Sequence, residues 1–387
     1  MGIDVRNLRR SVFKSYMKLK CVFVPIKKNV MFSSFKGEQY SDNPRAISEK
    51  LHELYPDIGI YWYLITDKDG KYGSVPDYVH RCKSKKEFYK YVLSSFCFVT
   101  NTEIDNNIIK RKNQFFIQTW HGDTGMKKIL LDSKRRKGKP VNDSKYTDLA
   151  ISGSELSVNK YHTAFNYHGE ILKMGTPRND RLVCRDLAAE TRLKCKLNIE
   201  ENAKILLYAP TFRAGNGLQS VDVNINEVLK TLEDKYDQKW VCLIRAHSGS
   251  GGIDIECDGN RFISVSDYPD MSDLLAICDM LLTDYSSCAG DPIRVKKPVI
   301  LAQFDKKEYI SADRELYYDP EEAGFIVAYD QEQLINILKT YTVDDYNKSC
   351  EKIMAYFDIV ESGKTSDEIC KRINDFYCKT FCGEKSH

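Results

Sequence analysis

Hydroxyl and acidic residues follow an apolar run in the second half of the chain, and their spacing could bind phosphate. The run ends at Leu282, and Thr283, Asp284, Ser286 and Ser287 come directly after it. Backbone N–H groups and hydroxyls at the start of a helix bind anions readily. Serines there also act as simple N-caps, which is the reading this segment alone favours. The phosphate interpretation therefore depends on what the other strand ends contribute.

Three further apolar runs also deliver polar side chains into loops. Residues 114–119 lead into His121, residues 171–174 lead into Arg178-Asn179-Asp180, and a third run leads into Arg213. Open α/β sheets build their ligand sites at such carboxyl ends of strands. His121 is the best general base, because imidazole titrates near neutral pH. Arg213 suits bidentate binding of phosphate.

Several other polar residues keep more than one interpretation. His247 ends a strand-like run; it could bind a diphosphate or act with His121 across a cleft, or simply cap the strand. Asp284 beside a phosphate repels it unless the carboxylate binds a hydroxyl, a cation or an N–H group. Asp291 could share that site or lie on the surface of a helix's first turn. Residues 178–180 more readily shape a hinge loop.

As a set, these segments resemble one family. With Ser41–Arg45 upstream and Lys297–Ile300 downstream, they are similar to the CDP-glycerol:poly(glycerol phosphate) glycerophosphotransferases of teichoic acid and capsule synthesis. The resemblance covers about residues 30–375. It implies that an acceptor hydroxyl attacks the β-phosphorus of a CDP-polyol, most readily CDP-glycerol, and releases CMP. The acceptor would be lipid-linked.

The resemblance also implies roles for three groups of residues. Catalysis is assigned to His121 and His247. The donor's phosphates and nucleotide are assigned to Arg213, Thr283, Asp284, Ser286, Ser287 and Asp291. The acceptor is assigned to Asp42, Asn43, Arg45, Asp123 and Lys127. No cofactor is expected, since the CDP-polyol is a substrate and no metal cage is recognisable; Mg²⁺ is left open, with Asp284 and Asp291 as its candidates.

One loop departs from the family pattern and leaves alternatives open. The common form continues Trp-His-Gly with Thr-Pro-Leu-Lys, whereas this chain has the longer Asp123–Lys128 and no proline. A changed loop beside the expected base puts the polyol and the acceptor in doubt, so CDP-ribitol remains an alternative donor. A GT-B sugar-nucleotide glycosyltransferase is a second alternative, and a non-enzymatic binding module is a third.

Strand-like runs alternate with helical periods, which predicts an α/β fold. Helices are expected near 44–55, 85–94 and 154–166. The first series of strands is expected at 30–33, 60–65, 96–100, 115–119, 149–152 and 171–174. The second is expected at 204–209, 240–245, 262–265, 280–283, 299–301 and 325–327. We therefore expect a GT-B-like fold, with two Rossmann-like doubly wound domains facing a cleft.

Length suggests the same organisation, because 387 residues suit two domains. We expect an N-terminal helix over 1–28, an acceptor domain over 29–175, a CDP-polyol domain over 176–342, and C-terminal helices over 343–387 that pack back across both domains. The 13 cysteines lack a CxxC pair, which favours free thiols. With no apolar run of spanning length and no signal peptide, the chain is expected to be cytoplasmic.

The net charge of +3 hides two basic segments. Residues 1–28 carry eight Lys or Arg against Asp4, interleaved with apolar residues near a helical period. Such a helix suits an anionic membrane surface, and packing on a domain is the alternative. The cluster Lys134–Lys139 could meet a polyanionic acceptor or the bilayer, or be a solvated loop. A nucleic-acid partner is not expected, because no basic motif is interleaved with aromatic residues. We thus expect a protein held peripherally on the inner face of the membrane.

Overall fold

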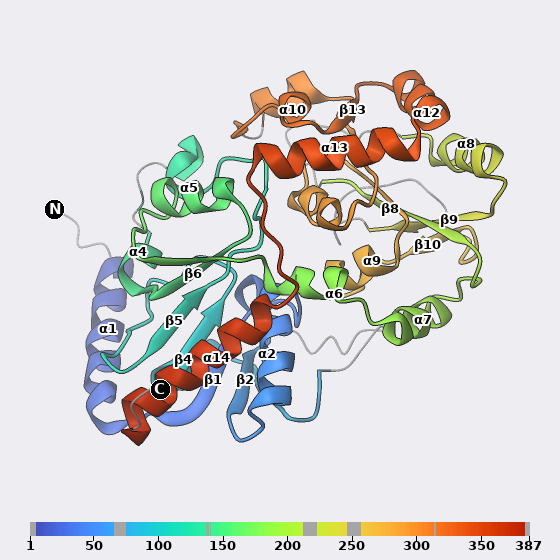
Figure 1. Cartoon of the computed structure of the whole chain (residues 1–387). Coiled ribbons are helices and arrows are strands. Elements are labelled where there is room, and N and C mark those ends of the chain that lie inside the picture. The colour runs from blue at the N-terminus through green and yellow to red at the C-terminus, as the bar shows by residue number, and fades with distance from the viewer. Residues whose placement is uncertain are drawn as a thin grey trace.

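The protein forms two α/β domains that face each other (Figure 1). Each domain has a parallel sheet covered by helices, which confirms the predicted GT-B-like fold class. The structure is a computed structural model that describes residues 5–65, 75–136, 139, 141–211, 223–245, 257–312 and 315–383.

The N-terminal sheet has seven parallel strands in the order β3-β2-β1-β4-β5-β6-β7. From β1 the chain steps outward to β2 and β3, and then crosses to β4 on the other side of β1. The direction of winding therefore reverses between β1 and β4, the point at which open sheets bind ligands. The strands are β1 (Lys27–Ser33), β2 (Gly59–Tyr63), β3 (Val79–Cys82), β4 (Ser95–Thr100), β5 (Phe115–Gln118), β6 (Leu149–Ser152) and β7 (Glu170–Lys173).

The C-terminal sheet repeats this topology with six parallel strands in the order β10-β9-β8-β11-β12-β13. Its winding reverses between β8 and β11. Both of these central strands are almost wholly buried, as expected for a parallel sheet covered on both faces. The strands are β8 (Lys204–Ala209), β9 (Trp240–Ile244), β10 (Phe262–Ser264), β11 (Met280–Thr283), β12 (Val299–Ala302) and β13 (Ile326–Ala328).

Helices cover both sheets, and the last two connect the domains (Figure 1). α13 packs on the C-terminal domain, whereas α14 returns to pack on α2 of the N-terminal domain. The longer helices are α1 (Val5–Phe23), α2 (Asp42–Leu54), α3 (Lys85–Ser94), α5 (Glu155–Thr163), α7 (Leu187–Lys196), α8 (Ile225–Tyr236), α12 (Gln331–Thr340), α13 (Val343–Tyr356) and α14 (Thr365–Tyr377). The shorter ones are α4 (Asp143–Tyr146), α6 (Asp180–Val183), α9 (Met271–Ile277), α10 (Lys306–Ala312) and α11 (Pro320–Ala323).

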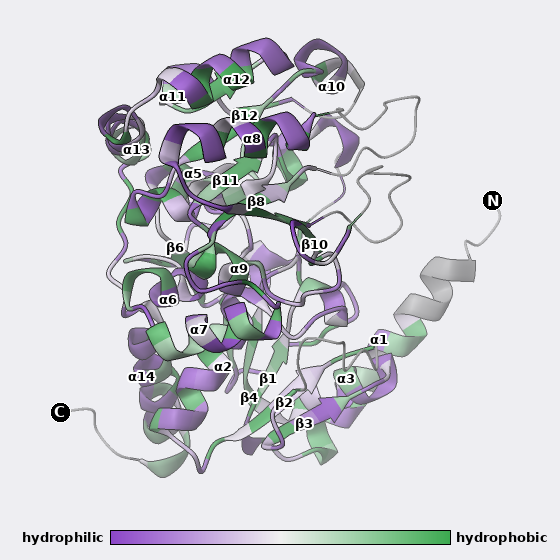
Figure 2. Ribbon diagram, turned by 90° about the vertical axis from the view of Figure 1, so that its right-hand side faces the viewer, coloured by the Kyte–Doolittle hydropathy of each residue, from purple (hydrophilic) through white to green (hydrophobic). Residues whose placement is uncertain are grey.

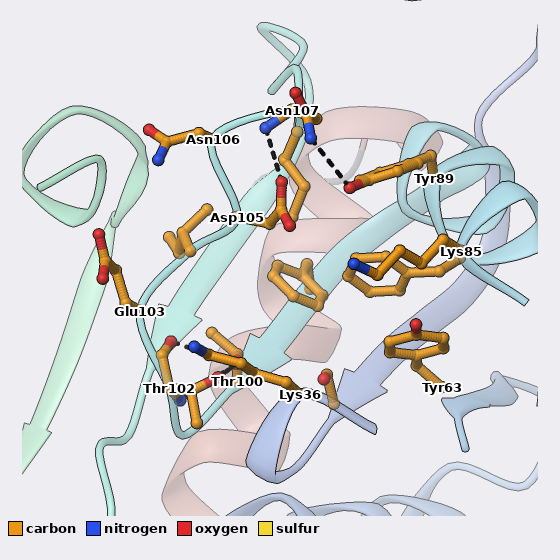
Figure 3. Close-up of a pocket in the computed structure, with 15 residues that line it drawn as sticks. Lys36, Tyr63, Lys85, Tyr89, Thr100, Thr102, Glu103, Asp105, Asn106 and Asn107 are labelled. Carbon is orange, nitrogen blue, oxygen red and sulfur yellow. Dashed lines mark hydrogen bonds between the residues drawn. The ribbon is translucent and has the colours of Figure 1, made fainter. Parts of the chain in front are cut away.

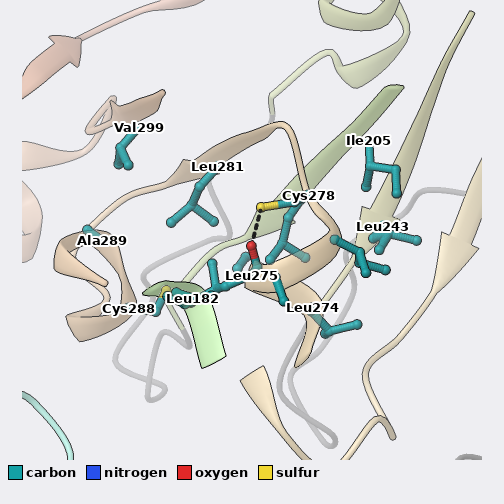
Figure 4. Packing of buried hydrophobic residues seen from close by; sticks show 14 of the residues in the cluster. Leu182, Ile205, Leu243, Leu274, Leu275, Cys278, Leu281, Cys288, Ala289 and Val299 are labelled. Carbon is teal, nitrogen blue, oxygen red and sulfur yellow. Dashed lines mark hydrogen bonds between the residues drawn. The ribbon is translucent and has the colours of Figure 1, made fainter. Parts of the chain in front are cut away.

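The loop after β11 is anchored in the core of the C-terminal domain (Figure 4). Cys288 and Ala289 are buried in one apolar cluster with Leu182 of α6 and with Leu274 and Leu275 of α9. Burying a leucine side chain contributes about 1.5–3 kcal/mol, so this packing fixes the loop firmly. Its two preceding serines are thereby held at a defined position.

Two local predictions were wrong. No strand was expected between residues 65 and 96, but β3 lies there and contains His80. It is a four-residue strand at the sheet edge that buries only its two end residues. Such a short pattern carries little signal. The segment after Ser286 was expected to open a helix, but it is a 3₁₀ helix at Ser287–Gly290, followed by another at Pro292–Val295.

Candidate active site

A cleft of about 610 Å³ lies between the two domains, at the carboxyl ends of both sheets. Phe35, Trp120 and His121 line it from the N-terminal domain. Ser286 and Ser287 line it from the C-terminal domain, next to the point at which the winding of that sheet reverses. The cleft therefore brings together the base and the hydroxyls that were predicted from separate strand ends.

His121 is held in the tautomer that a general base needs. Its Nδ1 lies 2.6 Å from the carbonyl oxygen of Asn101, so Nδ1–H donates and Nε2 keeps its lone pair. The ring packs against Phe35 at 5.2 Å and against Trp120 at 4.2 Å between centroids. Burial lowers the pKa of His121, which keeps the imidazole neutral near pH 7.

Non-glycine residues around His121 adopt left-handed backbone conformations. Trp120 has φ +49°, Phe35 has φ +46° and Asp42 has φ +66°. Each such residue costs about 1–3 kcal/mol unless its surroundings hold it, and such residues cluster at functional sites. At Trp120 the turn ends β5 and carries His121 into the cleft, where Phe35 and Trp120 pack on the ring.

Ser286 and Ser287 present hydroxyls to the cleft. The Ser286 hydroxyl also accepts a 3.5 Å bond from the Cys288 N–H, so part of the N-cap interpretation applies. Because the following helix is a short 3₁₀ turn, a large helix dipole does not contribute here. Phosphate binding would instead rest on the two hydroxyls and on basic side chains nearby.

Ser287 also contacts the opposite domain. Its Cβ would lie 3.2 Å from a Cβ placed at Gly122 and 3.3 Å from one placed at Gly125. These contacts are tighter than most side chains accept, so both positions favour glycine. Gly122 thus lines the cleft and also lets the two domains approach each other closely.

Thr283 and Asp284 shape the loop that carries Ser286 and Ser287, and they do not line the cleft themselves. The Thr283 hydroxyl donates to the Ala209 carbonyl at 2.6 Å, which ties β11 to β8. Oδ1 of Asp284 accepts from the N–H groups of Thr211 and Tyr285, at 2.8 and 2.6 Å. Their described contacts orient the residues that do face the cleft.

Arg178 is the centre of a buried network beneath His121. Its guanidinium donates to the His121 carbonyl at 2.7 Å and to Asp42 at 2.8 Å, and it pairs with Asp291 at 2.9 Å. Asp291 is only 3% exposed, so its alternative placement on the surface is wrong. The sequence suggested only a hinge-shaping role for Arg178, because its two acidic partners, Asp42 and Asp291, lie more than 100 residues away in either direction.

Asn43 and Arg45 also join elements at the domain junction. Asn43 donates to the Trp120 carbonyl at 2.9 Å and accepts from the Arg178 N–H at 3.0 Å. Arg45 pairs with Asp273 at 2.8 Å and with Asp270 at 3.2 Å, both in the C-terminal domain. Neither residue lines the cleft, whereas Asp42 does. Both residues were assigned to the acceptor, but their contacts place them in the domain junction.

Asp123 is buried in the same junction. It pairs with Arg294 of the other domain at 2.5 Å and accepts from the Gly153 N–H at 2.9 Å. The Arg294 side chain is fully buried and also lies 3.1 Å from Glu361. Asp123 was assigned to the acceptor, but its carboxylate is occupied between the domains.

Lys160 of α5 holds the loop Asp123–Lys128, which departs from the family pattern. Its amine donates to the carbonyls of Gly125 at 2.7 Å, Asp123 at 3.1 Å and Gly122 at 3.4 Å. Burial lowers the pKa of Lys160 to about 7, and the nearby Asp123 carboxylate opposes that shift. The sequence placed this lysine on an ordinary helix and gave no signal for the contact. Lys127, which was also assigned to the acceptor, lines the cleft.

Basic side chains dominate the charge of the cleft. Lys127, Arg135, Lys160, Arg178 and Arg245 all line it. Arg135 belongs to the basic cluster that the sequence placed beside the site. The acids there include Asp42 and Asp291, which both pair with Arg178. Five basic side chains in one cleft suit a diphosphate.

Arg213 and His247, predicted for phosphate binding and catalysis, lie outside the described residues. Within the ranges that are described, no group of three or more His, Cys, Asp or Glu side chains could hold a metal ion.

A sequence model of the family "CDP-Glycerol:Poly(glycerophosphate) glycerophosphotransferase" matches residues 16–375. This chain belongs to that family. Teichoic acid glycerol-phosphate transferase of Staphylococcus aureus is 31% identical, and the match covers 95% of this chain and 97% of that protein. Teichoic acid ribitol-phosphate polymerase TarK of the same species is 26% identical over 94% of this chain and 72% of the polymerase. The family members compared are enzymes, and this chain is a glycerophosphotransferase-type enzyme.

Longer relatives share the same domain pair. Teichoic acid poly(glycerol phosphate) polymerase of Bacillus subtilis is 28% identical over 90% of this chain, but the chain spans only 49% of that polymerase. A solved structure of the wall teichoic acid polymerase TagF superposes with a TM-score of 0.80 at 27% identity, covering 98% of this chain and all of the TagF chain compared. The glycerophosphotransferase fold thus extends over nearly the whole sequence.

Proposed function

We propose that this glycerophosphotransferase moves glycerol phosphate from CDP-glycerol to a hydroxyl of a lipid-linked teichoic acid acceptor. The observation that carries the proposal is the bond between His121 Nδ1 and the Asn101 carbonyl, which leaves Nε2 as a proton acceptor in a basic cleft. The higher identity to the glycerol-phosphate relative than to the ribitol-phosphate one supports glycerol as the polyol.

The chemistry follows from the two walls of the cleft. The acceptor hydroxyl oxygen forms a bond to the β-phosphorus, and its proton passes to Nε2 of His121. The bond from that phosphorus to the oxygen of CMP breaks, and CMP leaves with the electron pair. Ser286, Ser287 and Arg245 line the opposite wall and would stabilise charge on the phosphates. CMP is a good leaving group, so no strong acid is required.

The test is to incubate the protein with a lipid-linked acceptor and CDP-glycerol, CDP-ribitol or a UDP-sugar in turn. We expect CMP from CDP-glycerol and a product heavier by one glycerol phosphate or more in mass spectrometry. Transfer from CDP-ribitol but not from CDP-glycerol would mean that the polyol is ribitol. Release of UDP with sugar transfer would place the protein among GT-B glycosyltransferases instead.

We also propose that α1 holds the enzyme at an anionic membrane surface. One side of α1 packs on the N-terminal domain beside α3 (Figure 2). On that side Met17 is buried, and the rings of Phe13 and Tyr89 lie 5.2 Å apart between centroids. The other side exposes apolar residues one helical turn apart: Val12, Tyr16, Leu19, Val22 and Phe23, each at least 52% exposed. The exposed Lys18 and Lys20 lie on the same helix between these apolar residues, and Lys27 follows at the start of β1.

This arrangement fits a helix lying in the membrane interface. An apolar stripe would insert at the level of the headgroups, and each nearby lysine would contribute about 1 kcal/mol on anionic lipid. In the described part of the chain, no helix is long and apolar enough to cross a membrane. The expected association is therefore peripheral.

Point substitutions test the membrane proposal better than truncation does, since removing α1 would also remove Met17 from the core. Leu19→Glu with Val22→Glu should abolish sedimentation with anionic vesicles and leave the melting temperature unchanged. Leu187→Glu with Val343→Glu is the matched control, because both residues are at least 62% exposed elsewhere. Equal vesicle binding by the two double variants would contradict the proposal.

A further inference from the structure

A second cavity lies inside the N-terminal domain, separate from the cleft. It has a volume of about 300 Å³ and is lined by the ends of three neighbouring strands, by α3 and by residues 102–108 (Figure 3). Ser33, Tyr63 and Thr100 are the last residues of β1, β2 and β4. None of the five residues assigned to the acceptor from the sequence lines this cavity.

The position of this cavity in the topology is that of a ligand site. Ser33 and Thr100 mark the point between β1 and β4 at which the winding of the sheet reverses. The equivalent point of the C-terminal sheet, between β8 and β11, opens into the cleft beside Ser286. Ligands of open α/β sheets bind at such points, so the N-terminal sheet has a site of its own.

Tyr63 supplies an independent sign that the cavity binds a polar group. Its side chain is 3% exposed, yet its hydroxyl makes no hydrogen bond, which is costly for a buried polar atom. In Figure 3 the hydroxyl points toward the Lys85 side chain. The ring is fixed from below, because a Cβ at Gly37 would lie 2.6 Å from it. The hydroxyl is thus held in place for a partner that comes from outside the protein.

The rest of the lining defines the chemistry of that partner. Lys36 and Lys85 bring two ammonium groups, and Lys85 has no carboxylate within ion-pair distance among the described residues. Thr100, Asn106 and Tyr89 bring hydroxyl and amide groups. Of the two acids, Glu103 is already paired with Arg136 at 2.6 Å, and Asp105 accepts from the Asn107 N–H at 2.7 Å. This set suits one phosphate bearing a small hydroxylated group.

A single strained turn connects the second cavity to the cleft. Phe35 and Lys36 are both left-handed, with φ +46° and +59°; Phe35 lines the cleft against His121, and Lys36 lines the second cavity. Asn101 lies between the two sites, because its neighbours Thr100 and Thr102 line the second cavity while Asn101 itself contacts Phe35 and His121 of the cleft lining. Its side chain accepts from the Phe35 N–H at 2.9 Å, and its carbonyl accepts from His121. In each of these two segments, a residue that lines the second cavity is therefore the direct neighbour of one that contacts His121.

The second cavity also adjoins the helix proposed to meet the membrane. Tyr89 contributes to its lining and packs on Phe13 of α1. Moving from α1 toward the cleft, one meets first this cavity, then the turn at residues 35–37, and then His121. A lipid-linked chain entering from the membrane side would follow that order.

We infer that the second cavity binds a polyol-phosphate unit of the acceptor, next to the hydroxyl that reacts at His121. This inference rests on the proposed function and adds a subsite to it. The terminal hydroxyl lies in the cleft, while the preceding phosphate meets Lys36 and Lys85 and its hydroxylated group meets Tyr63. Such a subsite makes the enzyme select acceptors that already carry a polyol phosphate.

The test combines Tyr63→Phe with Lys85→Ala, which removes the free hydroxyl and one cation but keeps the ring in place. We expect the KM for a synthetic acceptor with two glycerol phosphate units to rise at least about tenfold, since a bond to a charged group is lost. The KM for CDP-glycerol and the melting temperature should not change. Lys86→Ala, the next residue on α3 and absent from the cavity lining, is the matched control.

A binding measurement separates this inference from the proposed function. Isothermal titration of the two-unit glycerol phosphate probe, without any donor, should show binding to the parent protein and to Lys86→Ala, and at least about tenfold weaker binding to the double variant. Equal binding by all three proteins overturns the subsite. If the parent protein released no CMP from any donor, the proposed function would fail, whereas this titration would still decide what the cavity binds.

Discussion

Two groups of polar residues follow strand ends in this protein, and they do different things. His121, Ser286 and Ser287 turn into the cleft, where a substrate can reach them. Asp123 follows β5 and Arg45 lies in α2, the helix after β1, but both turn into the domain junction, where each is paired with a residue of the other domain. A strand end therefore brings a side chain near the site, and its partners decide whether it is free to do chemistry.

The physical difference between the groups is where their polar atoms are satisfied. In the junction, the charges of Asp123 and Arg294 are almost fully removed from water and depend on each other. In the cleft, His121 uses one ring nitrogen for the fold and keeps the other for substrate. Junction substitutions should therefore change stability first, and cleft substitutions should change rate or affinity first.

The largest effect is expected from His121→Ala. Losing a general base costs about 10²–10⁴-fold in rate, and the melting temperature should stay close to that of the parent. His162→Ala is the control, because its Nδ1 also bonds a backbone carbonyl, that of Tyr167 at 2.9 Å, but it does not line the cleft. Retention of more than about a tenth of the parent rate would remove His121 from the base role.

The junction group is tested by Asp123→Ala. Removing Asp123 takes the nearest carboxylate away from the fully buried Arg294 and leaves it Glu361 at 3.1 Å and Asp291 at 3.9 Å. Breaking a buried pair in this way costs about 3–5 kcal/mol of folding free energy. The midpoint of thermal unfolding should fall markedly, whereas Asp344→Ala, which breaks the exposed pair with Lys348, should leave it unchanged. A normal midpoint with a raised KM for the acceptor would restore the role that the sequence gave to Asp123.

The sequence predicted the scaffold well because its signal is local. Apolar runs bounded by polar residues located most strands, and the strand ends led directly to His121 and to Ser286 and Ser287. β3 was missed because four residues with two apolar positions carry almost no pattern. The 3₁₀ turn after Ser286 was missed because its hydroxyl and small residues read like the first turn of an α-helix.

The junction could not be predicted, because it depends on pairs that are distant in sequence. Asp123 and Arg294 are 171 residues apart, and Arg178 joins Asp42 to Asp291. In the sequence, each residue of these pairs is only a charged residue near a loop, and nothing indicates its partner. Lys160 shows the limit most clearly, since nothing in a helical segment marks one lysine as buried beneath a loop.

The two serines lie between the groups, since they face the cleft and also help to form a turn. Ser286→Ala with Ser287→Ala should raise the KM for CDP-glycerol about tenfold or more, because hydrogen bonds to charged groups are worth about 1.5–3 kcal/mol each. Alanine keeps the Cβ of Ser287 that packs against Gly122 and Gly125. If the serines only cap the turn, the melting temperature will fall and the KM will not change.

The pH dependence should follow the neutral form of His121. Burial and the nearby Arg178 and Lys160 lower its pKa, while Asp42 and the Asn101 carbonyl oppose them. The acidic limb of kcat/KM should therefore lie below pH 6.5, the ordinary value for histidine. The folded state binds fewer protons than the unfolded state between the lowered pKa and 6.5, so stability should also fall as the pH drops through that window. A limb at or above pH 6.5 would mean that another group titrates.

The smallest effect is expected from chelation. The carboxylates that face the cleft include Asp42 and Asp291, and Arg178 already pairs with both. Asp284 is turned toward the N–H groups of Thr211 and Tyr285. Because the cleft places basic side chains where a cation would otherwise neutralise the diphosphate, EDTA should leave the rate of CMP release nearly unchanged. Rates measured with EDTA and with added Mg²⁺ decide the matter. A strict requirement for Mg²⁺ would mean that Asp284 or Asp291 leaves its described partners when substrate binds, and the division between junction and cleft would then have to be redrawn around those two carboxylates.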